Sequence, residues 1–498
     1  MGAQFKVAGK YVFNIEDWSV EEDTTPLSAG DTFGGTGSLR VTIPSPDPYT
    51  PHPQDTGSKW VLDYGRDILL GKDFVFQDSR YGMIDGTIKS VSASQFGMFE
   101  VQCETSLNKL NIYNVQAQPF NGTLGNLIRY YCSLASTPTP VIASALNSRP
   151  IVAPGWSGEL WYHLKQLAIA EEFEIALVNG VPNFRLLRQR DVVRGRDISR
   201  GGDLNSNSLA QTVECYYYNT RAISNTLVYP PGGWNTDVEI LNVNAGETTE
   251  YTLELSASVS SITQPTPVLN VSPDYTAASR YTVVGSDGLV VQPAMWTDRG
   301  GRVEVSINPD TTSLTVKLTG ARSIPTVQGT PSTNFQIALA SDTSGSRYST
   351  LRIVGTGVAY EQKKLTLRTG VPASQTGTEV GETTDNVFLR TLNQAYRAGI
   401  RSAVRFSGPV PSVSATLSDP TRNLGFGTVA GSRLFNKDSQ RYFRIRDASI
   451  SPGETSVSTE DDLLHQDIEG ANTSKTYAQV QATRNGVTYR DNYLMGMR

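Results

Sequence analysis

The chain has 498 residues, of which 38% are hydrophobic and 18% are charged, and its formal net charge is −5. This length predicts about three domains with substantial cores, and the acidic balance argues against nonspecific nucleic-acid binding and against membrane-surface binding through a basic patch. The 44 glycines and 26 prolines suit many short strands joined by turns, so we predict a mainly β (α+β) fold.

Cysteine usage and hydropathy indicate a soluble protein without a disulfide framework. Cys103, Cys132 and Cys215 are odd in number and far apart, so we expect reduced, buried thiols. The first residues, MGAQFKVAGKYVFNIEDW, lack the apolar run of a signal peptide, and no span of 18 apolar residues occurs. We therefore expect synthesis in the cytosol and no membrane span.

The first predicted domain covers residues 1–115 and is a β-barrel. Short alternating runs such as Leu39, Val41 and Ile43 are separated by turn residues about every 8–12 positions, a spacing typical of a small barrel or sandwich.

Residues 116–224 predict a small α+β domain. Thr123 is placed to cap a helix whose apolar face is formed by Leu124, Leu127, Ile128 and Tyr131. A second helix is expected after Ser157, which we predict to be its N-cap, with Glu159 in the first turn. Its apolar face contains Leu160, Leu164, Leu167, Ala168 and Glu171.

A hairpin follows this helix directly. The period changes from 3.6 to 2 at Phe173, Ile175 and Leu177, and Asn179-Gly180 is a dipeptide that closes two-residue hairpins. Phe184 and Leu186 form the returning strand. Helix and hairpin together predict a structural nucleus rather than a reaction centre.

The composition changes in residues 225–370, which we predict to be inserted β-sandwich modules. Thr, Ser, Val and Gly dominate, helix signals are nearly absent, and alternating runs recur, for example at Tyr251, Leu253 and Leu255. Residues 371–470 then predict a helix capped by Asp385, with Val387, Leu392, Ala395 and Tyr396 inward, and a second β-barrel domain containing Phe443, Ile445 and Ile450. The tail, residues 471–498, has an Asn485-Gly486 hairpin signal and is expected to order only against a partner.

Three stretches resemble a known family. Residues 17–44, DWSVEEDTTPLSAGDTFGGTGSLRVTIP, resemble the N-terminal signature of minor tail proteins from long non-contractile-tailed phages of actinobacteria. The helix-hairpin at 157–187 is similar to a unit of their central baseplate hub proteins, and residues 443–462, FRIRDASISPGETSVSTEDD, resemble the closing strand pair of that hub. The resemblance implies two hub-type β-barrel domains joined by a small α+β domain and assembled as a ring of three. The insert at 225–370 departs from the minimal hub.

The arginine-dense segment 185–200 has two interpretations. It contains Arg185, Arg188, Arg190, Arg194, Arg196 and Arg200, interrupted by Asp191 and Asp197. The arginines either line a channel through which DNA passes or lie on a solvated or interfacial strand with ion pairs. We favour the ion pairs, because the chain is acidic and a channel that lets DNA through should not bind its phosphates tightly.

Nothing in the remaining polar residues predicts catalysis. His52, His163 and His465 are too distant in sequence to be placed in one metal site, so packing or surface roles are expected. We interpret Glu171-Glu172 as a helix end and strand start, and Glu460-Asp461-Asp462 as a solvated acidic loop. No HExxH, GxSxG or P-loop occurs. We therefore predict no catalytic, cofactor-binding or metal-binding residues, no cofactor, and no enzyme.

The aromatic residues Tyr216-Tyr217-Tyr218, Trp234 and Trp296 also have two interpretations. They stack on sugar rings of a cell envelope, or they form core and rim positions of strands. We favour core and rim.

The first functional hypothesis is a structural protein of the phage tail tip. A homotrimeric hub would connect the tail tube and distal tail proteins to the tip and to other minor tail proteins. It would surround the channel for tape-measure protein and DNA, and so serve host attachment and DNA ejection. Such a protein is assembled in the host cytoplasm and located in the virion. The alternative is a tail-tip module that binds host cell-wall glycan through the inserted β-sandwich, and the third alternative is a cell-wall hydrolase.

Overall fold

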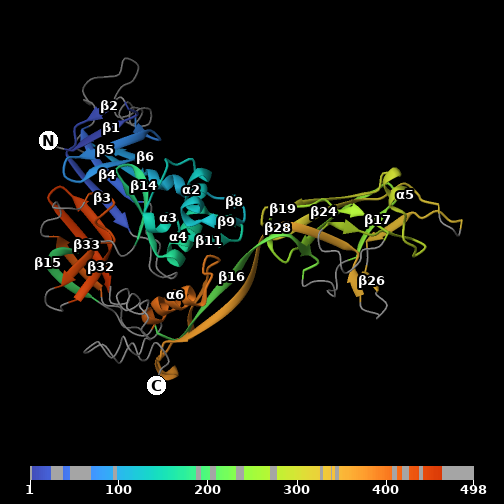
Figure 1. Ribbon diagram of the computed structural model, residues 1–498. Helices are drawn as coiled ribbons and strands as arrows, with labels where there is room; N and C mark the ends of the chain where they lie inside the picture. Colours follow the sequence, from blue (N-terminus) through green and yellow to red (C-terminus); the bar gives the residue numbers. More distant parts are fainter. Residues whose placement is uncertain are drawn as a thin grey trace, which may run out of the picture.

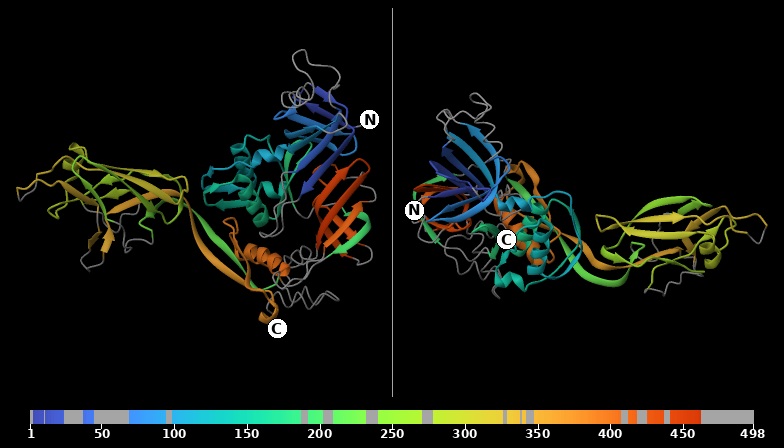
Figure 2. Two further views of the ribbon diagram at one scale, coloured as in Figure 1. Left: turned by 180° about the vertical axis from the view of Figure 1, so that it is seen from behind. Right: turned by 90° about the horizontal axis from the view of Figure 1, so that it is seen from above.

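The computed structural model describes residues 3–9, 11–23, 37–44, 69–93, 98–186, 192–201, 209–231, 240–269, 278–325, 329–337, 339–341, 347–406, 412–417, 425–436 and 441–461. The structure has a body, which contains strands from both ends of the chain, and an insert that is carried away from the body on a long two-stranded arm (Figure 1). The views in Figure 2 show the same separation from behind and from above. The fold is mainly β, as the sequence predicts.

One twelve-stranded sheet organises the body, in the order β2-β1-β5-β6-β7-β4-β3-β32-β31-β15-β30-β33. Its N-terminal half consists of β1 (Gln4–Val7), β2 (Tyr11–Phe13), β3 (Asp17–Asp23), β4 (Ser38–Pro44), β5 (Asp73–Asp78), β6 (Gly82–Ala93) and β7 (Met98–Thr105). Alternate residues of these strands are buried, as in β4, because one face of the sheet covers the core.

The C-terminal half of the sheet closes into a ring. It consists of β15 (Val192–Gly201), β30 (Ser412–Leu417), β31 (Arg433–Asn436), β32 (Arg441–Ser451) and β33 (Glu454–Asp461). Because β33 pairs with both β30 and β32, these five strands form a closed barrel. β15 joins this barrel although it precedes the insert in sequence. Glu460 and Asp461 belong to β33, so the prediction of an acidic loop is wrong for these two residues.

The two halves are joined by strands from opposite ends of the chain. β3 pairs with β32 in an antiparallel register that sets Val20 opposite Ile450 and Glu22 opposite Ala448. The ring centroids of Trp18 and Tyr81 lie 5.9 and 5.4 Å from that of Phe426, which precedes β31. The Phe426 N–H donates to the Tyr81 carbonyl at 2.7 Å. The core is therefore continuous across the junction.

A small α+β part packs against the sheet. It contains η2 (Ser106–Leu110), β8 (Val115–Ala117), β9 (Phe120–Thr123), α2 (Leu124–Leu134), β10 (Val141–Ile142), α3 (Ser144–Asn147), β11 (Pro150–Ala153), β12 (Trp156–Gly158), α4 (Leu160–Glu171), β13 (Phe173–Val178) and β14 (Val181–Leu186). Thr123 caps α2 as predicted, accepting from Asn126 N–H at 3.4 Å. The hairpin is also confirmed, since Val178 pairs with Val181 and both Asn179 and Gly180 have positive φ.

The predicted start of α4 is wrong by two residues. Ser157 lies in β12, where it pairs with Gln116, and Glu159 occupies the N-cap position without a side-chain capping bond. Strand pairing uses the backbone of Ser157, so this residue does not cap the helix. The predicted apolar face of α4 is nonetheless buried in full, including Glu171.

The arm and its base form a second large sheet. β16 (Ala210–Tyr229) and β28 (Leu351–Arg368) pair along most of their length, and β29 (Thr378–Asp385), which follows η4 (Ala373–Gln375), pairs with β16 in parallel. α6 (Leu392–Arg405) packs on this base (Figure 1).

The insert is a β-sandwich around its own core. Its elements are β17 (Leu241–Asn244), β18 (Thr248–Glu254), β19 (Ser258–Ile262), β20 (Thr266–Pro267), β21 (Arg280–Tyr281), β22 (Val284–Gly285), α5 (Pro293–Asp298), β23 (Arg302–Ile307), β24 (Ser313–Thr319), β25 (Asn334–Ile337), β26 (Leu339–Ser341) and β27 (Arg347–Ser349). The sheets β18-β24-β23 and β17-β25-β22 enclose one core with the distal ends of β16 and β28.

The predicted cap of α6 is also wrong. Asp385 ends β29 and accepts a hydrogen bond from the Tyr218 hydroxyl. Thr391 caps α6 instead: its hydroxyl accepts from Gln394 N–H at 3.2 Å, and the Gln394 side chain accepts from Thr391 N–H at 3.2 Å. Because the helix starts later than predicted, Leu392 faces solvent and is 55% exposed, whereas Ala395 is buried as expected.

Candidate functional site: the junction of body, arm and insert

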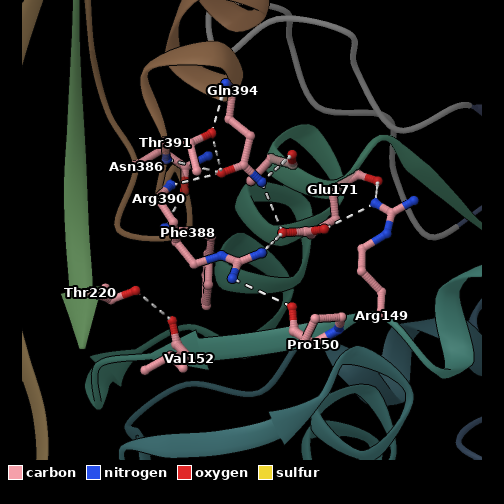
Figure 3. A network of polar contacts seen from close by, with 11 residues as sticks. Arg149, Pro150, Val152, Glu171, Thr220, Asn386, Phe388, Arg390, Thr391 and Gln394 are labelled. Carbon is pink, nitrogen blue, oxygen red and sulfur yellow. Dashed lines mark hydrogen bonds and ion pairs between the residues drawn. The ribbon is translucent and has the colours of Figure 1, made fainter. Parts of the chain in front are cut away.

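The C-terminus of α4 is the centre of a polar network that joins the body to the base of the arm (Figure 3). Glu171, the last residue of α4, is 2% exposed. Its carboxylate binds Arg390 at 2.6 Å and Arg149 at 3.0 Å, and it accepts from the Gln394 amide at 3.0 Å. A carboxylate at a helix C-terminus is unfavourable for the helix dipole, and the two guanidinium groups offset that cost.

Further contacts tie the start of α6 and the loop before it to α4. Arg397 binds Glu172 at 3.0 Å, and the Gln394 amide also donates to the Ala170 carbonyl at 3.2 Å. The buried Asn386 donates to the Gln166 carbonyl at 2.8 Å. Each bond joins residues more than 200 positions apart, so the network fixes α6 against the helix-hairpin unit.

Strand β16 of the arm makes hydrogen bonds to the body. The Thr220 hydroxyl of β16 donates to the Val152 carbonyl of β11 at 3.0 Å (Figure 3). Tyr218, also in β16, donates to Asp385 and accepts from the Gln362 amide at 3.0 Å. Burial and the bond to Asp385 raise the pKa of Tyr218, so its hydroxyl stays protonated as a donor.

The insert also contacts the body directly. Gly155, in the turn between β11 and β12, donates its N–H to the Ser258 hydroxyl at 2.8 Å, and Ser258 shares a buried hydrogen bond of 2.6 Å with Thr311. A Cβ at position 155 would lie 2.4 Å from the Thr311 hydroxyl oxygen, so glycine is required for this close approach. Among the described residues, the insert therefore joins the body through the arm and through this contact.

A second group of buried charges joins the N-terminal strands, the hairpin and the barrel. Glu174 of β13 is paired with Arg444 of β32 and lies 3.8 Å from the Arg185 guanidinium of β14. Glu22 of β3 accepts from the N–H groups of Gly427, Val429 and Ala430 at 2.6, 3.2 and 3.1 Å. Burial raises the pKa of Glu22, and these N–H groups together with Arg185 oppose the rise.

Of the arginine segment and the three histidines, Arg185 and His163 lie within the described structure with their side chains. Arg185 is in the buried ion-pair group, as the ion-pair interpretation expects. His163 stacks on Trp156, with ring centroids 3.8 Å apart, and burial lowers its pKa to about 4, so it is a neutral packing residue near neutral pH. The side chains of Arg188, Arg190, Arg194, Arg196 and Arg200, and all of His52, His465, Asp462 and Trp234, lie outside the described residues.

The tyrosine run and Trp296 occupy core and rim positions. Tyr218 is buried, whereas Tyr216 and Tyr217 are half-buried. Trp296 is fully buried in the core of the insert, where its indole N–H donates to the Tyr281 hydroxyl at 3.0 Å. The three cysteines are free and buried, as predicted.

The ionisable groups of the junction bind other groups of the protein. Within the described ranges, no group of three or more His, Cys, Asp and Glu residues has the arrangement of a metal site. Glu22, Glu171, Glu174 and Arg444 are engaged in the ion pairs and hydrogen bonds given above. The three thiols have raised pKa values because they are buried. None of the helices in the described ranges is long and apolar enough to cross a bilayer.

The sequence reasoning missed the residues that form the junction. Arg149, Arg390 and Gln394 belong to segments that are distant from Glu171 in sequence, and no local pattern pairs them. One signal was available, because Thr391 and Gln394 have the T-x-x-Q spacing of a capping box. That spacing predicts the start of α6 but not its contact with α4.

Comparison with known proteins gives matches among solved structures. No protein-family model matches the sequence, and no curated protein matches it. Among solved structures, the prophage tail protein gp18 from Listeria monocytogenes is similar, with 7% identity, a TM-score of 0.41, and coverage of 97% of this chain and 98% of that one.

Two further structures show the same level of similarity. A tail protein from Neisseria meningitidis has 9% identity and a TM-score of 0.43, over 93% of this chain and 97% of that one. The 43 kDa tail protein of prophage MuSo2 from Shewanella oneidensis has 10% identity and a TM-score of 0.41, over 92% and 98%. Similarity at this level defines neither activity nor partners.

Proposed function

We propose that this chain is a structural protein of a phage tail tip. In this role it is a homotrimeric baseplate hub that adapts the tail tube and distal tail protein to the tip and surrounds the channel for tape-measure protein and DNA. The observation that carries the proposal is the twelve-stranded sheet, in which β3 and β32 unite the two ends of the chain. This pairing sets an N-terminal run of strands beside a closed C-terminal barrel in one continuous sheet.

Each chain has two β units, the N-terminal run of strands and the C-terminal barrel. Two units per chain suit a protein that connects a six-fold symmetric tube to a three-fold symmetric tip. Three copies would present six β units, which is the number that a six-fold tube requires, while the trimer keeps three-fold symmetry toward the tip. The buried charges Glu22, Glu174, Arg185 and Arg444 support this role, because they lie between the units and oppose their separation. The resemblance of residues 17–44 to phage minor tail proteins supports the same role.

The test is the oligomeric state of the purified full chain, alone and with tail tube protein, measured by mass photometry. We expect a trimer, at least when tube protein is present. An obligate ring should bury well over about 1,200 Å² per interface. A chain that stays monomeric under both conditions would contradict the proposal.

A second candidate function concerns the insert. The β-sandwich is carried away from the body on the arm (Figure 1), which is a suitable position for binding a host cell-wall glycan. Asn225 N–H donates to the Thr356 hydroxyl at 3.4 Å, so these residues are adjacent across the arm and residues 226–355 can be replaced by a short turn. If phage carrying this deletion assemble tails but do not adsorb, the insert binds the host. If tails fail to form, the insert is architectural.

The hydrolase alternative has no specific support among the described residues. We expect the purified chain to leave host cell wall intact, and release of soluble wall fragments by the isolated protein would contradict this expectation.

A further inference from the structure

Among the described residues, the sheet at the base of the arm has two edges without a neighbouring strand. Its strand order is β28-β16-β29, with β16 in the middle. Among the described strands, residues 359–368 of β28 pair with β16 alone, and β29 likewise pairs with β16 alone. In Figure 1, β28 lies on the side of the arm that faces away from the helices of the body. Each open edge presents a row of backbone donors and acceptors, which is a template for another strand.

The two edges carry opposite charge. Residues 359–368 of β28 contain three basic residues, Lys363, Lys364 and Arg368, and one acidic residue, Glu361. Lys363 binds Glu361 at 3.3 Å and Lys364 binds Glu214 of β16, so the basic charge that this edge offers to a second copy is chiefly that of Arg368. β29 contains three acidic residues, Glu379, Glu382 and Asp385, and no basic residue, and the Asp385 carboxylate accepts from the Tyr218 hydroxyl within the chain. Arg368 and Glu379 are both exposed. An edge that is basic and an edge that is acidic complement each other between two copies of the chain.

Strand direction and length also match. β28 runs antiparallel to β16 and β29 runs parallel to it, so β28 and β29 are antiparallel to each other. β29 of a second copy, laid on the open edge of β28, therefore forms an antiparallel pair. β29 has eight residues and the open stretch of β28 is of similar length.

We propose that β29 of one copy adds to the β28 edge of the next copy, so that the base sheets join head to tail around the trimer. This inference rests on the proposed trimeric hub and names the surface through which its copies associate. A contact between two different patches is heterologous, and it closes into a ring when the rotation between copies permits. The alternative is that Lys363 and Lys364 only protect an exposed edge from pairing.

A charge exchange on the full chain tests the contact. Arg368→Glu and Glu379→Arg each set like charges against each other at the proposed contact, and each should weaken association at least about tenfold. The chain carrying both substitutions restores opposite charges and should return to the wild-type mass distribution. Arg302→Glu, an equivalent change on an exposed ion pair of the insert, serves as the control and should have no effect. Sedimentation velocity and mass photometry measure the distribution.

A disulfide provides a second, independent measurement. Thr366 and Thr383 are exposed and both are level with Glu214 of β16, one on each side. Within one chain they are two strand spacings apart, roughly 9.6 Å, which exceeds the Cα separation that a disulfide allows. In the Thr366→Cys/Thr383→Cys chain, a disulfide therefore forms only between copies, and the three native cysteines are buried. In the register that sets Thr366 opposite Thr383, Arg368 and Glu379 are diagonal neighbours, which long charged side chains can bridge. Oxidation should then give covalent dimers and trimers.

The outcomes separate this inference from the proposed function. If the wild-type chain is a trimer, but both charge variants remain trimers and the cysteine pair does not cross-link, the edge contact is wrong and the hub stands. If the wild-type chain remains monomeric even with tube protein, both are wrong.

Discussion

Removing the Glu171 carboxylate should release α6 from α4. In Glu171→Ala, Arg149 and Arg390 lose their shared partner. A hydrogen bond to a charged group contributes about 1.5–3 kcal/mol. The Arg390 side chain is 19% exposed and keeps most of that value, and the Gln394 amide of α6 also loses its bond to this carboxylate, which adds about 1 kcal/mol. Arg149 lies between α3 and β11, so its bond to Glu171 does not contribute to the stability of α6. The sum is about 3 kcal/mol.

Hydrogen–deuterium exchange of the α6 amides measures this loss. The opening free energy of α6 should fall by about 3 kcal/mol, which makes exchange ~100-fold faster. Glu171→Gln, which keeps a neutral acceptor, should give roughly half of the free-energy change. The matched control is Glu304→Ala, which removes a surface ion pair with Arg302 at 3.5 Å and should leave α6 unchanged. The reasoning is refuted if Glu171→Ala leaves α6 exchange at its wild-type rate, or if the control accelerates it equally.

Three further changes test local features of the structure. Burial lowers the pKa of His163 from 6.5 to about 4, so the folded protein holds this side chain neutral. Between pH 6.5 and pH 4 the unfolded chain therefore binds a proton that the folded chain does not. The free energy of unfolding should fall by at most about 3 kcal/mol over this range. His163→Phe should flatten this part of a denaturation-versus-pH curve while keeping the stack on Trp156, and an unchanged slope would contradict the assignment. Thr391→Ala removes the α6 cap and should cost about 1 kcal/mol of helix stability in exchange measurements, whereas Thr391→Ser should preserve the cap. Gly155→Ala sets a methyl group against Thr311 and should increase protease cleavage between body and insert; a wild-type cleavage rate would show that the contact does not hold the insert.

Local features of the fold were predictable from the sequence. The hairpin at Asn179-Gly180, the cap at Thr123 and the buried face of α4 each depend on residues close together in the chain, and each is confirmed. The two wrong caps have one cause. Ser157 and Asp385 are good capping residues by type, but strand pairing and the bond from Tyr218 already engage them. Tertiary contacts therefore overrode local preference.

Long-range features were not predictable from one sequence. β15 joins the C-terminal barrel across the whole insert, and Glu171 meets an arginine 219 positions later. Register and pairing at such separations leave no local periodicity, because each strand shows only which of its faces is buried. The mainly β class and the presence of an insert follow from composition and alternation. The junction that fixes the arm does not.

Electron cryomicroscopy of intact phage tails tests the central proposal most directly. We predict density for this chain on the tail axis, in three copies around an open channel, with the inserts projecting outward. A single copy, or a position away from the axis, would contradict the proposed hub.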